Sequence, residues 1–191
     1  VANVDTSYRV EYYYEENGVY PDTTTEYRTG KGRTDSEVEV TTTDKWPMKN
    51  GYVLDESRTD DHKGIIRGDG KLVLKVYFKQ QFTVTYKPGK HGDFTEQRYH
   101  VAYNANTPDF DGEKTGKAGY TFVGWSPEVV ANVTENAEYV AQWSGLNVTK
   151  VVTDHLSTGD AFVEGNTIHF EITVENIGDV ALTDVIVKDT L

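Results

Sequence analysis

The stretch Tyr8-Arg9-Val10-Glu11-Tyr12-Tyr13-Tyr14 alternates apolar and polar side chains before it ends in three consecutive tyrosines. The stretch Phe82-Thr83-Val84-Thr85-Tyr86 repeats the alternation. Successive side chains of a β-strand point to opposite faces, so this pattern predicts strands with one face on a core and the other in water. No segment shows the period of an amphipathic helix, although Thr107-Pro108-Asp109-Phe110 is compatible with a short helical turn. The chain is therefore expected to be mainly β.

Each of these two stretches opens a longer pattern of three elements. A Gly-Tyr pair that begins another predicted strand follows at Gly51-Tyr52 and at Gly119-Tyr120. An alternating strand then closes each pattern, at Leu74-Lys75-Val76-Tyr77-Phe78 and at Tyr139-Val140-Ala141-Gln142-Trp143. Turn residues separate the elements, as in Glu16-Asn17-Gly18. Three elements in the same order at similar spacing predict two related modules.

A third unit follows the pair Ser144-Gly145. Residues 146–151 and 168–174 alternate cleanly, and Asn176-Ile177-Gly178-Asp179 predicts a turn into a strand from Leu182 to Val187. This pattern is typical of the first half of an immunoglobulin-like sandwich. The chain begins without Met and stops soon after the last predicted strand, so we expect it to be a piece of a longer polypeptide.

Composition narrows the class of partner. The formal net charge is −12, which disfavours nucleic acid and anionic membrane surfaces as partners. There is no cysteine, so the chain has neither disulfides nor cysteine metal sites. No stretch is apolar for long enough to predict insertion in a membrane. Aromatic residues make up 12% of the chain and include thirteen tyrosines, which favours strands over helices.

The first module, residues 7–80, resembles the mucin-binding protein (MucBP) repeat of bacterial surface proteins. The resemblance is carried by the tyrosine-rich stretch at residues 8–14, by Asn17-Gly18, by Gly51-Tyr52-Val53-Leu54-Asp55 and by residues 72–79. Residues 1–6 precede it as a tail.

The second module, residues 81–143, resembles the internalin-type B-repeat (Listeria-Bacteroides repeat). Its motifs are Gly119-Tyr120-Thr121-Phe122-Val123-Gly124-Trp125 and Ala141-Gln142-Trp143. Residues 146–191 are similar to part of an immunoglobulin-like bacterial surface repeat, with motifs at Val148-Thr149-Lys150 and at residues 170–178 and 185–191.

These resemblances imply tandem small β-grasp (ubiquitin-like) modules followed by a partial immunoglobulin-like β-sandwich, in the extracellular, cell-wall-anchored surface protein of a Gram-positive bacterium. They imply a non-enzymatic role, either adhesion to host mucin or another glycoprotein or glycan, or service as a modular stalk. Anchoring to peptidoglycan would pass through a C-terminal region beyond this segment. An alternative is an accessory binding or spacer module of a secreted polysaccharide-degrading enzyme.

Aromatic side chains are the candidate ligand-binding residues. Tyr12, Tyr13 and Tyr14 alternate between the faces of one strand, so at least one ring should lie on the solvent side, where it could stack on a sugar or on a neighbouring strand. Trp46 stands outside the alternating strands and is the best candidate for an exposed ring. Trp125 and Trp143 are expected in the core, because a module of this size without disulfides needs large buried rings.

The sequence gives little support for a metal site or for catalysis. The acidic clusters Asp60-Asp61, Asp109-Phe110-Asp111 and Asp154 to Asp160 match no calcium-loop spacing, and the five histidines form no zinc motif. No catalytic or cofactor-binding motif is present, so neither enzyme activity nor a cofactor is predicted.

An isopeptide bond is the remaining possibility, and Lys150 with Glu171 is the obvious pair for it. The alternation of side chains between the two faces of a strand argues against this pair. Lys150 shares the inward phase of Val148, whereas Glu171 is out of phase with its apolar neighbours Phe170 and Ile172 and should face solvent.

Overall fold

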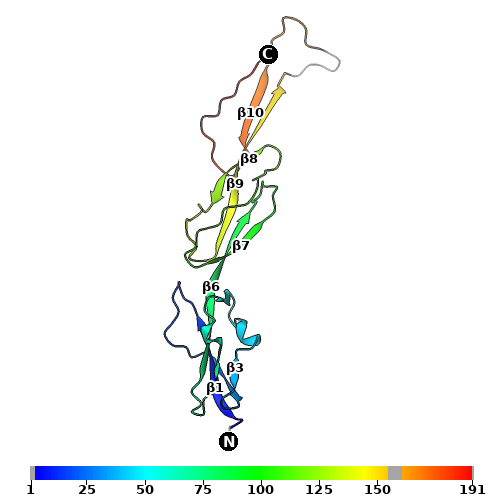
Figure 1. The fold of residues 1–191 in the computed structure, drawn as a ribbon. Coiled ribbons are helices and arrows are strands. Elements are labelled where there is room, and N and C mark those ends of the chain that lie inside the picture. Colours follow the sequence, from blue (N-terminus) through cyan, green and yellow to red (C-terminus); the bar gives the residue numbers. More distant parts are fainter. Residues whose placement is uncertain (1–2, 155–160, 191) are drawn as a thin grey trace. The chain divides into compact units, whose positions relative to one another are not determined.

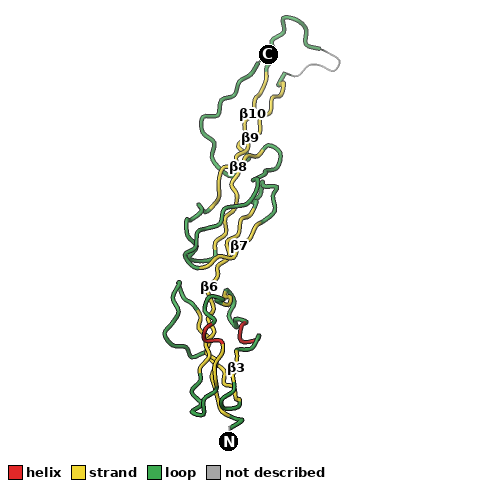
Figure 2. The backbone as a smooth tube through the Cα atoms, viewed as in Figure 1, coloured by secondary structure: helices red, strands yellow, loops and turns green. Residues whose placement is uncertain are grey.

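The computed structural model describes residues 3–154 and 161–190, which are mainly β as the sequence predicts. Figure 1 labels most of its strands, and Figure 2 shows the short 3-10 turns η1 (Thr43–Lys45) and η2 (Asp60–His62) in red among strands and loops. The strands of the described residues are β1 (Thr6–Tyr14), β2 (Tyr27–Gly32), β3 (Glu37–Glu39), β4 (Tyr52–Leu54), β5 (Lys63–Ile65), β6 (Val73–Lys87), β7 (Gln97–Ala102), β8 (Tyr120–Ser126), β9 (Ala137–Val152) and β10 (Phe170–Asn176).

The chain divides into two compact units. The first comprises Val1–Val84, Tyr99–Pro108 and Val130–Ala137, and the second comprises Thr85–Arg98, Asp109–Val129 and Glu138–Leu191. The boundary expected between the first two modules, at residues 80 and 81, lies within β6, and Ser144-Gly145 lies within β9. The module boundaries drawn from the sequence stay a prediction.

A parallel pair of strands, β1 and β6, forms the centre of the first unit. Tyr12 lies opposite Val76, Tyr13 opposite Tyr77 and Tyr14 opposite Phe78. Strand β2 pairs antiparallel with β1, and β4 pairs antiparallel with β6, so the strand order is β2-β1-β6-β4. Because the side chains alternate, this pairing gives the sheet two distinct faces.

One face of this sheet carries the core of the first unit. The core contains Val10, Tyr12, Tyr14, Val40, Leu74, Val76 and Phe78, all buried. Strand β3 pairs antiparallel with β5, and the chain beyond β3 brings Val40 onto the sheet. The ring of Tyr14 stacks on Phe78 with centroids 4.9 Å apart and meets Tyr52 edge-on at 5.0 Å. Large aromatic rings therefore fill a small core that has no disulfide to support it.

The buried carboxylate of Asp44 ties η1 to this core. The Arg28 guanidinium donates to both of its oxygens, the Tyr12 hydroxyl donates to Oδ1 at 2.7 Å, and the backbone and side chain of Thr41 donate to Oδ2. Burial alone would raise the pKa of Asp44, but these hydrogen bonds outweigh burial and hold the pKa well below its usual range. The loop that carries Trp46 is thereby fixed at its base.

A cluster of aromatic rings forms the core of the second unit. Trp143 is completely buried, as expected, and its indole N–H donates to the carbonyl of Pro88 at 2.8 Å. Trp125 is half-buried and packs against Tyr86 at 4.7 Å and Phe122 at 5.2 Å between ring centroids. The expectation that both rings lie in the core is thus confirmed for Trp143, whereas Trp125 packs on the cluster but stays half-buried.

The end of β9 and β10 form a two-stranded ribbon, in which Lys150 lies opposite Ile172. The strand expected from Leu182 to Val187 does not form. Asp184 adopts φ 55°, and this left-handed conformation breaks an extended segment. The short helical turn at residues 107–110 is also absent.

Replacing Phe78 by alanine tests the packing of the first core. Phe78 is completely buried, so Phe78→Ala should lower the free energy of unfolding by about 3–5 kcal/mol through lost burial and a cavity. The exposed Met48 offers a matched control, and Met48→Ala should change stability by less than about 0.5 kcal/mol. Urea denaturation followed by circular dichroism measures both, and similar losses for the two variants would contradict this core.

Candidate ligand-binding site

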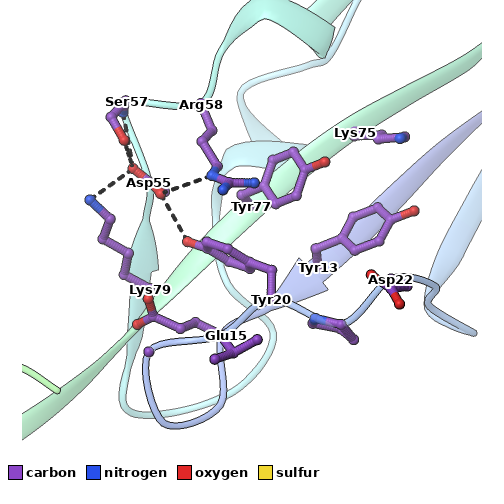
Figure 3. Close-up of a pocket in the computed structure, with 13 residues that line it drawn as sticks. Tyr13, Glu15, Tyr20, Asp22, Asp55, Ser57, Arg58, Lys75, Tyr77 and Lys79 are labelled. Atoms are coloured by element: carbon purple, nitrogen blue, oxygen red, sulfur yellow. Dashed lines mark hydrogen bonds and ion pairs between the residues drawn. The ribbon is translucent and has the colours of Figure 1, made fainter.

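A pocket of about 640 Å³ opens on the face of β1 and β6 that lies opposite the core (Figure 3). Strand β6 contributes Lys75, Tyr77 and Lys79 at alternate positions, and β1 contributes Tyr13. Two loops complete the walls, one with Tyr20 and Asp22 and the other with Asp55, Ser57 and Arg58. We call this site the tyrosine pocket, after Tyr13, Tyr20 and Tyr77.

A tight turn brings the first loop into the pocket. Glu16 and Val19 exchange backbone hydrogen bonds of 2.8 and 3.0 Å. The two residues between them, Asn17 and Gly18, both have positive φ, as a tight hairpin turn requires. The turn predicted at Glu16-Asn17-Gly18 is thus confirmed, and it returns the chain so that Tyr20 reaches the sheet.

The ring of Tyr77 contacts both other rings of the pocket. Tyr13 stacks on Tyr77 with centroids 5.0 Å apart and planes 25° apart. Tyr20 meets the same ring edge-on at 5.1 Å and 78°. Such offset and edge-to-face geometries are the favoured ones for aromatic pairs, so the rings hold one another in place. Burial and a hydrogen bond from its hydroxyl to Glu11 raise the pKa of Tyr13 to about 12.

The buried carboxylate of Asp55 joins the two loops to β6. It accepts hydrogen bonds from the Tyr20 hydroxyl at 2.9 Å, from the Ser57 hydroxyl and backbone N–H at 2.5 and 3.0 Å, and it pairs with Lys79 at 3.0 Å. Burial alone would raise the pKa of Asp55, but hydrogen bonds from Ser57, Lys79 and Tyr20 outweigh burial and lower the pKa to about 2. Burial and the bond to Asp55 raise the pKa of Tyr20. Asp55 is thus a fixed anion with its oxygens occupied, which suits positioning better than proton transfer.

The structure separates the three consecutive tyrosines of β1. Tyr12 and Tyr14 lie in the core, and Tyr13 lies on the pocket face. Tyr13 is only 5% exposed because Tyr77 covers it, so the ring expected on the solvent side is largely shielded. Trp46 is 71% exposed, as expected, but does not line the tyrosine pocket.

Sequence reasoning missed most of the pocket. Tyr77 shares the parity of Tyr13 in a paired strand, and this signal could have found it. Tyr20, Asp55 and Arg58 belong to loops without periodicity, so no sequence pattern marks them.

The remaining residues singled out in the sequence lie elsewhere. Lys150 pairs with Asp189 at 2.8 Å and lies over the ring of Phe170 at 4.1 Å, while Glu171 pairs in register with Val151 instead. Residues 155–160 of the acidic cluster from Asp154 to Asp160 are outside the described residues. In the parts of the chain that are described, no three acidic or histidine side chains gather in a way that could hold a metal ion.

Comparison with family models and with curated proteins assigns the chain to no family. No family model matches the chain, and no curated protein matches it. Among residues 3–154 and 161–190, no helix is long and apolar enough to cross a membrane.

The pH dependence of stability tests the role of Asp55. Its pKa of about 2 in the folded state lies below the value of about 3.9 expected when unfolded, so the unfolded state takes up the proton first as the pH falls. The stabilisation is therefore complete above about pH 4 and is lost towards about pH 2. Asp55→Asn should be less stable than the unmodified chain at neutral pH, and the difference should shrink through this range. Glu56→Gln, an exposed neighbour, is the control, and a pH-independent difference for Asp55→Asn would contradict the assignment.

His62 should make stability sensitive to mild acid. Its Nε2 is buried without a partner among the described residues, and burial lowers its pKa, with Lys45 lowering it further and Glu39 and Asp61 opposing. The unfolded state therefore binds the proton first, and stability should fall as the pH drops below about 6.5.

Urea midpoints measured from about pH 7 to about pH 5 test the role of His62. The unmodified chain should lose more stability than His62→Gln over this range. His100→Gln, which alters an exposed histidine of the same unit, should follow the unmodified chain. Parallel curves for all three proteins would show that His62 is not responsible.

Proposed function

We propose that this chain is a non-enzymatic segment of an extracellular, cell-wall-anchored bacterial surface protein, in which the tyrosine pocket of the first module binds a glycan of host mucin or a related glycoprotein. The observation that carries the proposal is the pocket itself: three tyrosine rings beside a buried, fully paired carboxylate and exposed polar groups. Aromatic faces pack on the C–H faces of sugars, while charged and polar groups bind the hydroxyls.

A β-grasp fold for the first module is part of the same proposal. It is supported by the strand order β2-β1-β6-β4, in which the first and last strands of the module lie side by side and parallel. In place of a helix, the segment with β3 and Val40 covers the sheet. The resemblance to a MucBP repeat stays a prediction that this topology supports.

The second and third modules are proposed as spacers. The rings of the second unit contact one another in its core, so they are needed for folding there. Binding is therefore best sought on the first module.

The proposal is tested with the whole chain and mucin glycans by isothermal titration calorimetry. Tyr77→Ala removes the ring that contacts both other tyrosines and should weaken binding at least about tenfold. Trp46→Ala, which removes an exposed ring outside the pocket, should leave binding unchanged. Melting curves check that both variants are folded.

Two outcomes would contradict the proposal. No binding by the folded chain would leave only the spacer role. Loss of binding in Trp46→Ala but not in Tyr77→Ala would move the binding face to the loop after η1.

A further inference from the structure

Two tyrosine rings and Asp55 hold Arg58 at the mouth of the tyrosine pocket. Its guanidinium carbon lies 4.7 Å from the Tyr20 ring centroid and 4.9 Å from that of Tyr77. Its Nε forms an ion pair with Asp55 at 4.0 Å, a distance beyond that of a hydrogen bond. Figure 3 shows the side chain beside Asp55 and Tyr77. The two rings therefore hold the guanidinium in place through cation–π contacts, which do not use its N–H groups as hydrogen-bond donors.

The N–H donors of Arg58 remain available to a ligand. The Arg58 side chain donates no hydrogen bond to the residues that the structure describes, and the side chain is 51% exposed. A planar guanidinium with free, preoriented donors is the protein group best matched to a carboxylate or a sulfate, which it binds through two parallel hydrogen bonds.

Lys75 adds a second positive charge to the pocket. It occupies the same face of β6 as Tyr77, and its ammonium lies 5.7 Å from the Tyr13 ring centroid. No carboxylate of the described residues forms an ion pair with Lys75, whereas Lys79 is engaged by Asp55. The charge of Lys75 thus contributes to the potential that a ligand meets.

Three acids, Glu15, Asp22 and Asp55, line the pocket together with three cations, Lys75, Lys79 and Arg58, so selectivity for an anion rests on where the donors lie and not on net charge. Asp55 pairs closely with Lys79 at 3.0 Å and more distantly with Arg58 at 4.0 Å, and it accepts three hydrogen bonds. Glu15 accepts the backbone N–H of Gln80 at 3.1 Å, and Asp22 is exposed. An ionised carboxylate can accept hydrogen bonds but cannot donate them, so Glu15 and Asp22 suit the hydroxyl groups of a sugar ring.

We propose that the tyrosine pocket selects an acidic glycan, one that carries a carboxylate or a sulfate ester, and that Arg58 receives the anionic group while Lys75 strengthens the attraction. This inference rests on the proposed function of the pocket as a glycan site. It names the part of the ligand that determines specificity. In this pocket the rings contact the face of the sugar, the carboxylates accept hydrogen bonds from its hydroxyls, and Arg58 binds the acidic group.

The test compares three forms of one mucin-core oligosaccharide, neutral, sialylated and sulfated, by isothermal titration with the whole chain. Either or both acidic forms should bind at least about tenfold more tightly than the neutral form, since a charge-assisted bidentate contact is among the stronger polar interactions. Arg58→Gln should abolish this preference while leaving the neutral form bound as before. Lys75→Gln should reduce the preference by a smaller factor, and added salt should weaken only the acidic forms.

Arg9→Gln is the matched control. Arg9 also lies over a tyrosine ring, that of Tyr27 at 4.2 Å, and it is similarly exposed, but it does not line the pocket. Its replacement removes the same charge and should keep the preference intact. Arg58→Lys, which keeps the charge but not the planar fork, should lose most of the preference, and it provides a second variant if Arg58→Gln fails to fold.

The outcomes are distinguishable from failure of the proposed function. Equal affinity for all three oligosaccharides would overturn the acidic-glycan inference and leave glycan binding standing. An acidic preference that survives in Arg58→Gln would place the anion elsewhere and overturn the inference as well. No binding of any form would overturn both proposals.

Discussion

The parallel pairing of β1 with β6 is the constraint on which the first unit depends. Its register places Tyr12 and Tyr14 beside Val76 and Phe78 on one face and Tyr13 beside Tyr77 on the other. A shift by one residue would exchange these faces and bring the charged side chains of β6 into the core. The register that closes the core therefore also builds the floor of the tyrosine pocket.

Buried charges organise the loops on both sides of this sheet. Asp44 fixes the loop of η1 on the core side, and Asp55 fixes the loop after β4 on the pocket side. A buried carboxylate is tolerated only when it is paired and hydrogen-bonded, and each of these anions collects donors from distant parts of the chain. Loops without hydrophobic periodicity thus acquire defined positions. Two of them, the loop with Tyr20 and the loop with Asp55, form walls of the pocket.

The sequence predicted the strands better than the site. Alternation located β1, β4, β6, β8 and β9, and module size correctly placed Trp143 in the core, because both follow from burial on one face. The strand expected at residues 182–187 does not form because Asp184 has a positive φ, which no apolar pattern reveals. Tyr20 meets Asp55 and Arg58 only in the folded chain, since 35 residues separate Tyr20 from Asp55, so no local motif could mark the pocket. Parity alone placed Tyr12 and Tyr14 on a face opposite to Tyr13, but only the register with β6 shows which face is the core.

The proposed glycan-binding surface is the face of β1 and β6 opposite the core. Amide chemical-shift mapping of the whole labelled chain, titrated with an acidic mucin oligosaccharide, tests it most directly. The perturbed amides should cluster at Tyr13, Tyr20, Arg58 and Tyr77, with none in the second unit. Perturbations centred on Trp46, or spread over the second unit, would contradict it.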